Sequence, residues 1–137
     1  PNKDSFVSRG QHHSINFTGH TISTDGICGT KTLANIARCF QHAINLDYKE
    51  SLAVDGAFGT KSKEALGKHY VKNGEKQYLV TAVEIALMCR GYDPNGVECP
   101  GKFGDGLEKA VKQFQEDRGL TVDGIAGRNT ILKLIGC

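Results

Sequence analysis

The chain has 137 residues, a formal net charge of +2 and 39% hydrophobic residues. This length and composition suffice for a buried core, either as one domain or as two small domains that share an interface. No apolar run approaches the roughly 18 residues of a membrane span, and the first ten residues lack the apolar segment of a signal peptide. The 17 basic and 15 acidic residues give no electrostatic footprint for nucleic acid.

The N-terminal residues 1–18 carry no hydrophobic periodicity, and we expect them to be a linker or N-terminal extension that follows a missing upstream domain. His12, His13 and His20 cluster in and just after this segment. Zinc hydrolases use histidines, but the sequence has no HExxH motif and no periodic helix to hold these three side chains. They are expected to be histidines of a surface loop.

Helical periodicity begins after these residues. Residues 32–45 place Leu33, Ile36, Ala37, Phe40 and Ile44 on one face, which predicts an amphipathic helix. A shorter helix is predicted over 62–70, where Ala65 and Leu66 face inward. No segment has the alternation typical of a strand.

The second half of the chain repeats this organisation after a polar segment, residues 71–76, which contains an Asn-Gly pair and is the expected boundary. Residues 77–90 are apolar nearly all round and predict a central, buried helix that stops at Gly91. Leu107, Ala110, Val111 and Phe114 predict the counterpart of helix 32–45, with Gly119 as its left-handed C-terminal cap. A closing helix is expected over 129–135.

A glycine-turn motif occurs twice, as Val-Asp-Gly-Ala-Phe-Gly at 54–59 and as Val-Asp-Gly-Ile-Ala-Gly at 122–127. Each copy follows a helix that ends in Phe-Gln, at 40–41 and 114–115, and each helix follows an earlier glycine turn, at 25–29 and 102–104. The first copy has extra residues at 42–53, which are expected to form a loop.

Five cysteines, an odd number without CxxC spacing, are expected to be free thiols, most of them packed as small hydrophobic side chains. They are Cys28, Cys39, Cys89, Cys99 and Cys137. A bridge from Cys28 to Cys39 or from Cys89 to Cys99 remains open, because sequence alone does not establish a disulfide. This usage fits synthesis in a reducing cytoplasm better than a disulfide-built secreted scaffold.

The amphipathic helix ending in Phe-Gln, the run Gly-Leu-Thr-Val-Asp-Gly-Ile-Ala-Gly-Arg-Asn-Thr at 119–130 and the closing helix with Leu134 resemble the peptidoglycan-binding domain of bacterial and phage lytic enzymes. The resemblance is strongest over 78–137. The full run from residue 10, through residues 16–19, to residue 101 also looks similar to the C-terminal regions of clostridial and phage cell-wall amidases and muramidases.

This resemblance implies an all-α fold of two tandem three-helix-type peptidoglycan-binding repeats, packed around a shared apolar helix. The expected division is an extension at 1–18, a first repeat at 19–72 and a second at 73–137. The implied function is a non-catalytic module that targets an upstream lytic domain, in cis, to the wall of a Gram-positive host, as in an endolysin or autolysin.

The resemblance also implies where a wall ligand binds. The turn glycines permit close backbone approach, which is first a structural property, and the helix starts that follow them leave backbone N–H groups for carboxylates or glycan oxygens. Aromatic side chains offer a sugar-stacking surface, although a core role is the ordinary one for the two phenylalanines. The candidate binding residues are Asp55, Gly56, Phe58, Gly59, Lys61, Tyr92, Phe103, Gly104, Asp123, Gly124, Gly127, Arg128 and Asn129.

The implied partner is bacterial peptidoglycan or an associated wall polymer, without nucleic acid, membrane, cofactor or metal. The protein is expected to be made in the cytoplasm and to act extracellularly at the wall. The three Asp-Gly turns lack the oxygen ligands and the twelfth-position Glu of a calcium loop.

Two alternatives stay open. A small wall hydrolase needs a carboxylate pair, but Glu64, Glu75, Glu84 and Glu108 are expected on polar helix faces or loops with nothing to mark a pair, and no cysteine has a catalytic signature. A protein-interaction or oligomerisation module, such as a homodimer, is predicted if the apolar helix 77–90 and the cysteines are exposed.

Overall fold

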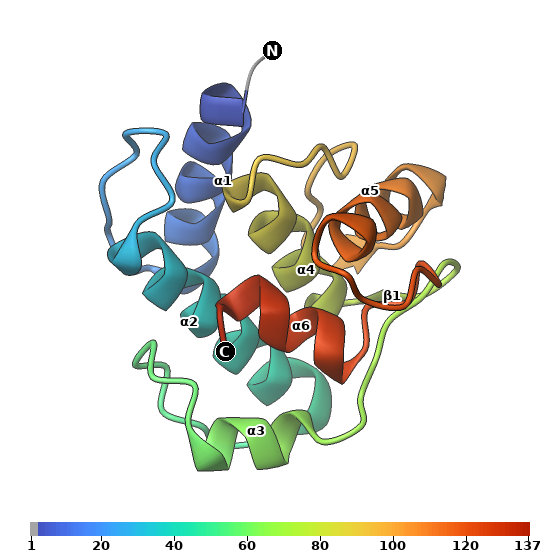
Figure 1. Ribbon diagram of the computed structural model, residues 1–137. Coiled ribbons are helices and arrows are strands. Elements are labelled where there is room, and N and C mark those ends of the chain that lie inside the picture. Colours follow the sequence, from blue (N-terminus) through green and yellow to red (C-terminus); the bar gives the residue numbers. More distant parts are fainter. Residues whose placement is uncertain (1–2) are drawn as a thin grey trace.

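The computed structural model of the protein describes residues 3–137, with side chains from residue 5 onward, and this part is mostly helical (Figure 1). The all-α class is thus confirmed. The helices are α1 (Lys3–Thr18), α2 (Thr30–Tyr48), α3 (Thr60–Leu66), α4 (Tyr78–Cys89), α5 (Asp105–Asp117) and α6 (Arg128–Ile135), and the strands are β1 (Lys76–Gln77) and β2 (Gly101–Lys102). None of the described helices is long and apolar enough to cross a membrane.

Helix α4 lies in the middle of the molecule, between α1 and α5 in Figure 1, and packs against α1, α2, α5 and α6. Every residue from 79 to 89 is buried, which the sequence predicted for the apolar residues of this stretch but not for Glu84. The start of α4 is held by Asp47 of α2, whose carboxylate accepts hydrogen bonds from the backbone N–H groups of Tyr78 at 3.0 Å and Leu79 at 2.6 Å. A carboxylate at this position also favours the positive end of the helix dipole.

The expectation of an unstructured start is wrong for the described residues, because α1 covers Lys3–Thr18 and packs against α4 and α2. Residues 1 and 2 lie outside the described part. The buried face of α1 is small and polar, with Val7, Gly10, Gln11 and Ser14 at helical spacing. Gly10 allows a close helix crossing, since a Cβ there would lie 2.7 Å from the backbone nitrogen of Cys89. An apolar pattern could not reveal such a helix.

Helix α2 continues to Tyr48 instead of ending near residue 45, so the first part of the extra segment extends the helix instead of forming a loop. The remainder is a loop, as predicted, and Asn45 holds it. The Asn45 side chain donates to the backbone oxygen of Leu52 at 3.0 Å and accepts from its backbone nitrogen at 2.8 Å. Helix α3 is shorter than predicted and ends at Leu66 before Gly67.

The C-terminal elements are tied to the segment that precedes α4. Val71 and Ala126 exchange two backbone hydrogen bonds of 3.1 and 2.9 Å, and β1 pairs antiparallel with β2. Strand content, which the sequence did not predict, is limited to these short pairings within residues 3–137. Arg90, just after α4, donates from its guanidinium to the backbone oxygens of Leu134 and Lys133 at the end of α6.

All five cysteines are free thiols, as predicted. Cys39 and Cys89 are fully buried in the core, and burial raises the pKa of both thiols. Cys99 and Cys137 are exposed.

Candidate functional site

The side chain of Gln115, near the end of α5, organises the turn before α6. Its amide nitrogen lies 2.9 Å from an Asp123 carboxylate oxygen, 3.0 Å from the backbone oxygen of Ile125 and 3.1 Å from the Thr130 hydroxyl. Its amide oxygen accepts from the backbone nitrogens of Asp123 at 3.1 Å and Gly124 at 3.0 Å. A single buried glutamine therefore connects the helix, the glycine turn and the start of the next helix.

Gln41 of α2 makes the same five contacts with the turn before α3. Its amide nitrogen lies 3.1 Å from Asp55, 3.0 Å from the Ala57 backbone oxygen and 3.1 Å from the Ser62 hydroxyl. Its amide oxygen accepts from the backbone nitrogens of Asp55 and of Gly56 at 3.1 and 3.0 Å. The Phe-Gln pairs that the sequence analysis aligned are therefore equivalent in structure.

We call such a set of hydrogen bonds, made by one glutamine side chain to a glycine turn and the helix after it, a frame. Gln11 of α1 forms a third frame. Its amide nitrogen approaches Asp25, the Ile27 backbone oxygen and Thr32 at 3.3, 3.0 and 2.9 Å, and its amide oxygen accepts from the Gly26 nitrogen at 2.9 Å. The turn at 25–29 is thus the counterpart of the turns at 55–59 and 123–127, and not of 102–104 as the sequence analysis paired it. The Asp-Gly pair that recurs in all three turns could have indicated their equivalence from the sequence.

The glycine of each turn has a backbone conformation that favours glycine. Gly26, Gly56 and Gly124 have φ angles of 80°, 80° and 73°. The preceding aspartate accepts a hydrogen bond from the nitrogen two residues on, at 2.9–3.0 Å, which closes the turn. These bonds, followed by the bond from the frame glutamine, hold the pKa of Asp25 and of Asp55 below the usual value, so both carboxyls are ionised at neutral pH.

Two of the three turns border a groove. The Lys61 groove has a volume of about 440 Å³ and lies between the loop after α2 and the start of α3; its walls are Gln41, Ser51, Leu52, Ala53, Asp55, Ala57, Gly59, Thr60, Lys61 and Ser62. The Asn129 groove has a volume of about 410 Å³ and lies at the start of α6; its walls are Gln115, Leu120, Thr121, Asp123, Ile125, Gly127, Arg128, Asn129 and Thr130. The matching positions make the two grooves counterparts.

Seven of the candidate binding residues line these grooves: Asp55, Gly59, Lys61, Asp123, Gly127, Arg128 and Asn129. Gly56 and Gly124 shape the turns beside them. Lys61 and Asn129 are exposed, whereas the Arg128 guanidinium donates to the backbone oxygens of Lys63 and Gly67 at the end of α3, at 2.8 and 3.1 Å. Arg128 therefore joins the two halves of the chain.

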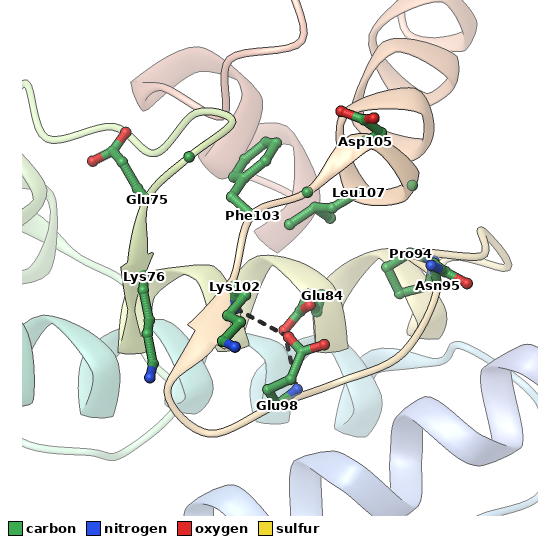
Figure 2. Close-up of a pocket in the computed structure, with 13 residues that line it drawn as sticks. Glu75, Lys76, Glu84, Pro94, Asn95, Glu98, Lys102, Phe103, Asp105 and Leu107 are labelled. Atoms are coloured by element: carbon green, nitrogen blue, oxygen red, sulfur yellow. Dashed lines mark hydrogen bonds between the residues drawn. The ribbon is translucent and has the colours of Figure 1, made fainter.

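The remaining candidates lie elsewhere. Phe58 and Phe103 are buried in the core, 8% and 3% exposed, and present no stacking surface. Tyr92 is half-buried, with its ring edge-on to Phe114 and its hydroxyl bonded to Asp117. Phe103 and Gly104 line a separate cavity of about 510 Å³ between α4, the paired strands β1 and β2, and α5 (Figure 2). The structure thus divides the candidate set between different regions.

The cavity of Figure 2 contains a buried acid that the sequence analysis misplaced. Glu84 was expected on a polar helix face, but it is 1% exposed on the apolar helix α4. Its carboxyl accepts a 3.4 Å hydrogen bond from the backbone nitrogen of Glu98 and also contacts the Glu98 carboxyl. Desolvation, followed by this contact, raises the pKa of Glu84 to about 9, so the group is a neutral acid at neutral pH. A single carboxylate within an otherwise apolar helix could have indicated from the sequence that Glu84 is buried.

Glu98 carries the charge of this pair. Its desolvation acts to raise its pKa, but the hydrogen bonds from the Lys102 backbone nitrogen, 3.0 Å long, and from Glu84 together lower it. The carboxyl groups of Glu84 and Glu98 are hydrogen-bonded to each other, whereas glycosidases separate theirs by about 5 Å or more. Figure 2 shows Glu98 pointing from the loop toward Glu84 on the helix.

The three N-terminal histidines were expected together on a loop. His12 and His13 instead lie on α1, and only His20 lies on the loop after it. Among the described residues, no group of three or more His, Cys, Asp or Glu side chains is placed to hold a metal ion.

Residues 76–134 match the family of putative peptidoglycan binding domains, which confirms the resemblance for this part of the chain. The matched range contains the Gln115 frame and the Asn129 groove. The chain is also similar to the uncharacterized protein FadG of Bacillus subtilis, with 28% identity over 107 residues, 77% of this chain and 18% of that protein. The chain thus spans a small part of this relative's length, and the similarity extends well before residue 76. No solved structure matches.

Proposed function

We propose that this chain binds peptidoglycan without catalysing a reaction, and that the Lys61 and Asn129 grooves are its binding sites. The observation that carries the proposal is the pair of matched grooves, each built on a glutamine-framed glycine turn. One of them lies inside the range that matches the peptidoglycan-binding family.

Each groove combines an apolar wall with polar groups whose positions are fixed. Leu52 and Leu120 occupy matching places, and Gln41 and Gln115 hold the turns rigid. Volumes of 410–440 Å³ fit a sugar ring or a short piece of stem peptide. Two weak sites on one polymer raise the apparent affinity by avidity, so neither groove needs to bind tightly alone.

The proposal includes the repeat organisation. We divide the chain into units at 19–72 and 73–137 that share the apolar helix α4. The equivalent frames of Gln41 and Gln115 support two units, and the packing of α4 against α2, α5 and α6 supports a shared helix. Helix α1 lies before these units, but its Gln11 side chain holds the turn at 25–29 within the first unit, so residues 3–18 are more structured than a linker.

The finer role that we propose is that of a targeting module. A family of binding domains supplies affinity for the wall, and the chemistry then belongs to a lytic domain upstream in cis, as in an endolysin or autolysin of phage or bacterial origin. The similarity to a short part of a longer protein is compatible with a module within a larger chain. The site of action would be the extracellular wall of a Gram-positive cell, after synthesis in the cytoplasm.

The two alternative functions have less support. Helix α4, whose exposure would have favoured an interaction or homodimerisation module, is buried within the chain. A hydrolase would need carboxylates flanking a bond, but Glu84 and Glu98 are in contact and leave no room for substrate between them.

The test is co-sedimentation of the chain with purified Gram-positive sacculi, before and after removal of secondary wall polymers, beside a turbidity assay for lysis. We expect binding without clearing, and binding that survives polymer removal. An absence of binding to both preparations would contradict the proposal in favour of a protein partner. Clearing of the suspension would show catalysis by the chain itself.

A further inference from the structure

The walls of the two grooves are alike at the positions that build the turn and differ at the rim. Shared positions carry Gln41 and Gln115, Leu52 and Leu120, Asp55 and Asp123, Gly59 and Gly127, and Ser62 and Thr130. Differing positions carry Ala53 and Thr121, Ala57 and Ile125, Thr60 and Arg128, and Lys61 and Asn129. Ligand preference that differs between the grooves must therefore come from the second set.

The two groove walls carry the same formal charge, one aspartate and one basic residue each, but the two basic residues differ in how they are held. Lys61 is exposed on the wall of its groove, and its ammonium forms no ion pair with any residue that the structure describes. The matching residue, Asn129, is uncharged. The basic residue of that groove is Arg128, whose Nη1 donates to the backbone oxygens of Lys63 and Gly67, so its guanidinium is anchored at the end of α3. The aspartate of each turn is common to both grooves, so the difference in charged groups is between the unpaired ammonium of Lys61 and the anchored guanidinium of Arg128.

We propose that the Lys61 groove selects an anionic group of the wall, with Lys61 as the specificity-determining residue, whereas the Asn129 groove takes an uncharged part of the polymer. This inference rests on the proposed function. The anion is a carboxylate of the stem peptide or a phosphate of a secondary polymer, since an ammonium recognises both. A wall segment that carries sugar and peptide then engages both grooves of one chain.

The experiment measures Kd by isothermal titration calorimetry for three ligands: a soluble disaccharide-tetrapeptide, a neutral N-acetylglucosamine oligomer and a glycerol phosphate oligomer. The variants are Lys61→Asn, which places at this position the residue that its counterpart groove has, and Asn129→Lys, which does the converse. Lys68→Asn is the control, because Lys68 is also exposed but lines neither groove. All three change the net charge by one.

We expect Lys61→Asn to raise the Kd for an anionic ligand roughly threefold to tenfold, as for loss of a charged hydrogen bond at an exposed rim. The Kd for the neutral oligomer should stay unchanged. Asn129→Lys should lower the Kd for the same anionic ligand. The Kd of the Lys68→Asn variant should stay within about twofold of that of the parent chain. The arm that responds, peptide or phosphate, identifies the source of the anion.

Equal affinity of Lys61→Asn and the parent chain for both anionic ligands would overturn the inference, as would an equal loss for the neutral oligomer. Binding of the parent chain to sacculi in that case leaves the proposed function intact. If the parent chain binds neither sacculi nor any of the three ligands, the proposed function fails and the inference fails with it.

Discussion

Replacing Gln115 with alanine removes all five hydrogen bonds that join α5, the glycine turn and α6. Two of the groups left without a partner, the backbone nitrogen of Gly124 and the hydroxyl of Thr130, belong to buried residues. An unsatisfied buried polar group costs about 1–3 kcal/mol, and entry of water into the vacated space offsets part of this. We therefore expect Gln115→Ala to lower the free energy of unfolding by about 2–4 kcal/mol.

Urea unfolding followed by circular dichroism at 222 nm measures this change. Gln113→Ala is the matched control, because Gln113 is exposed on the same helix and its substitution should change stability by less than about 0.5 kcal/mol. Gln115→Glu keeps the shape of the side chain but loses the donor amide and places a charge beside Asp123, so it should also destabilise the fold. A Gln115→Ala variant as stable as Gln113→Ala would refute the role given to the frame.

Two further predictions concern stability. The pKa of Glu84 is raised to about 9 in the fold from 4.5, so the folded state holds one more proton between those pH values. The free energy of unfolding should therefore fall as pH rises through this window, by at most about 1.4 kcal/mol per pH unit. Urea titrations at several pH values should show this dependence in the parent chain and not in Glu84→Gln. A parallel decline in both chains would contradict the prediction. Gly124→Ala, at φ 73° and with a Cβ 2.9 Å from Glu108, should lower the melting temperature, whereas Gly104→Ala, with open space around it, should not; equal melting temperatures would argue against strain at the turn.

The elements that the sequence predicted best are those with an apolar stripe. Helix α2 and helix α5 bury Phe40 and Phe114 as their spacing indicated, and α4 is the buried helix that its composition predicted. The glycine turns could also be predicted, because Asp-Gly pairs mark positions where the backbone must be left-handed. These are local signals, so one sequence suffices to detect them.

The elements that the sequence did not predict depend on polar burial. Helix α1 packs through Gly10, Gln11 and Ser14, and its buried polar side chains bond to partners at residues 25–35 and, for Ser14, also to the backbone of α1, so no hydrophobic period exists to detect. Glu84 is buried because the Glu98 carboxyl and the loop between α4 and β2 cover it, and this covering involves residues far along the chain. The candidate site was partly predicted for a related reason: the turn residues are local, whereas the core positions of Phe58 and Phe103 depend on tertiary packing.

The central claim is that the two grooves bind the wall polymer, and chemical-shift mapping of the isotopically labelled chain tests it most directly. On titration with the soluble disaccharide-tetrapeptide, we expect shift changes at residues 51–62 and 120–130, which line the grooves. The cavity between α4 and α5 provides the internal comparison, and residues 94, 95, 98 and 102–107 on its wall should stay unchanged. Shift changes confined to that cavity, or absent throughout at ligand concentrations of several millimolar, would contradict the account.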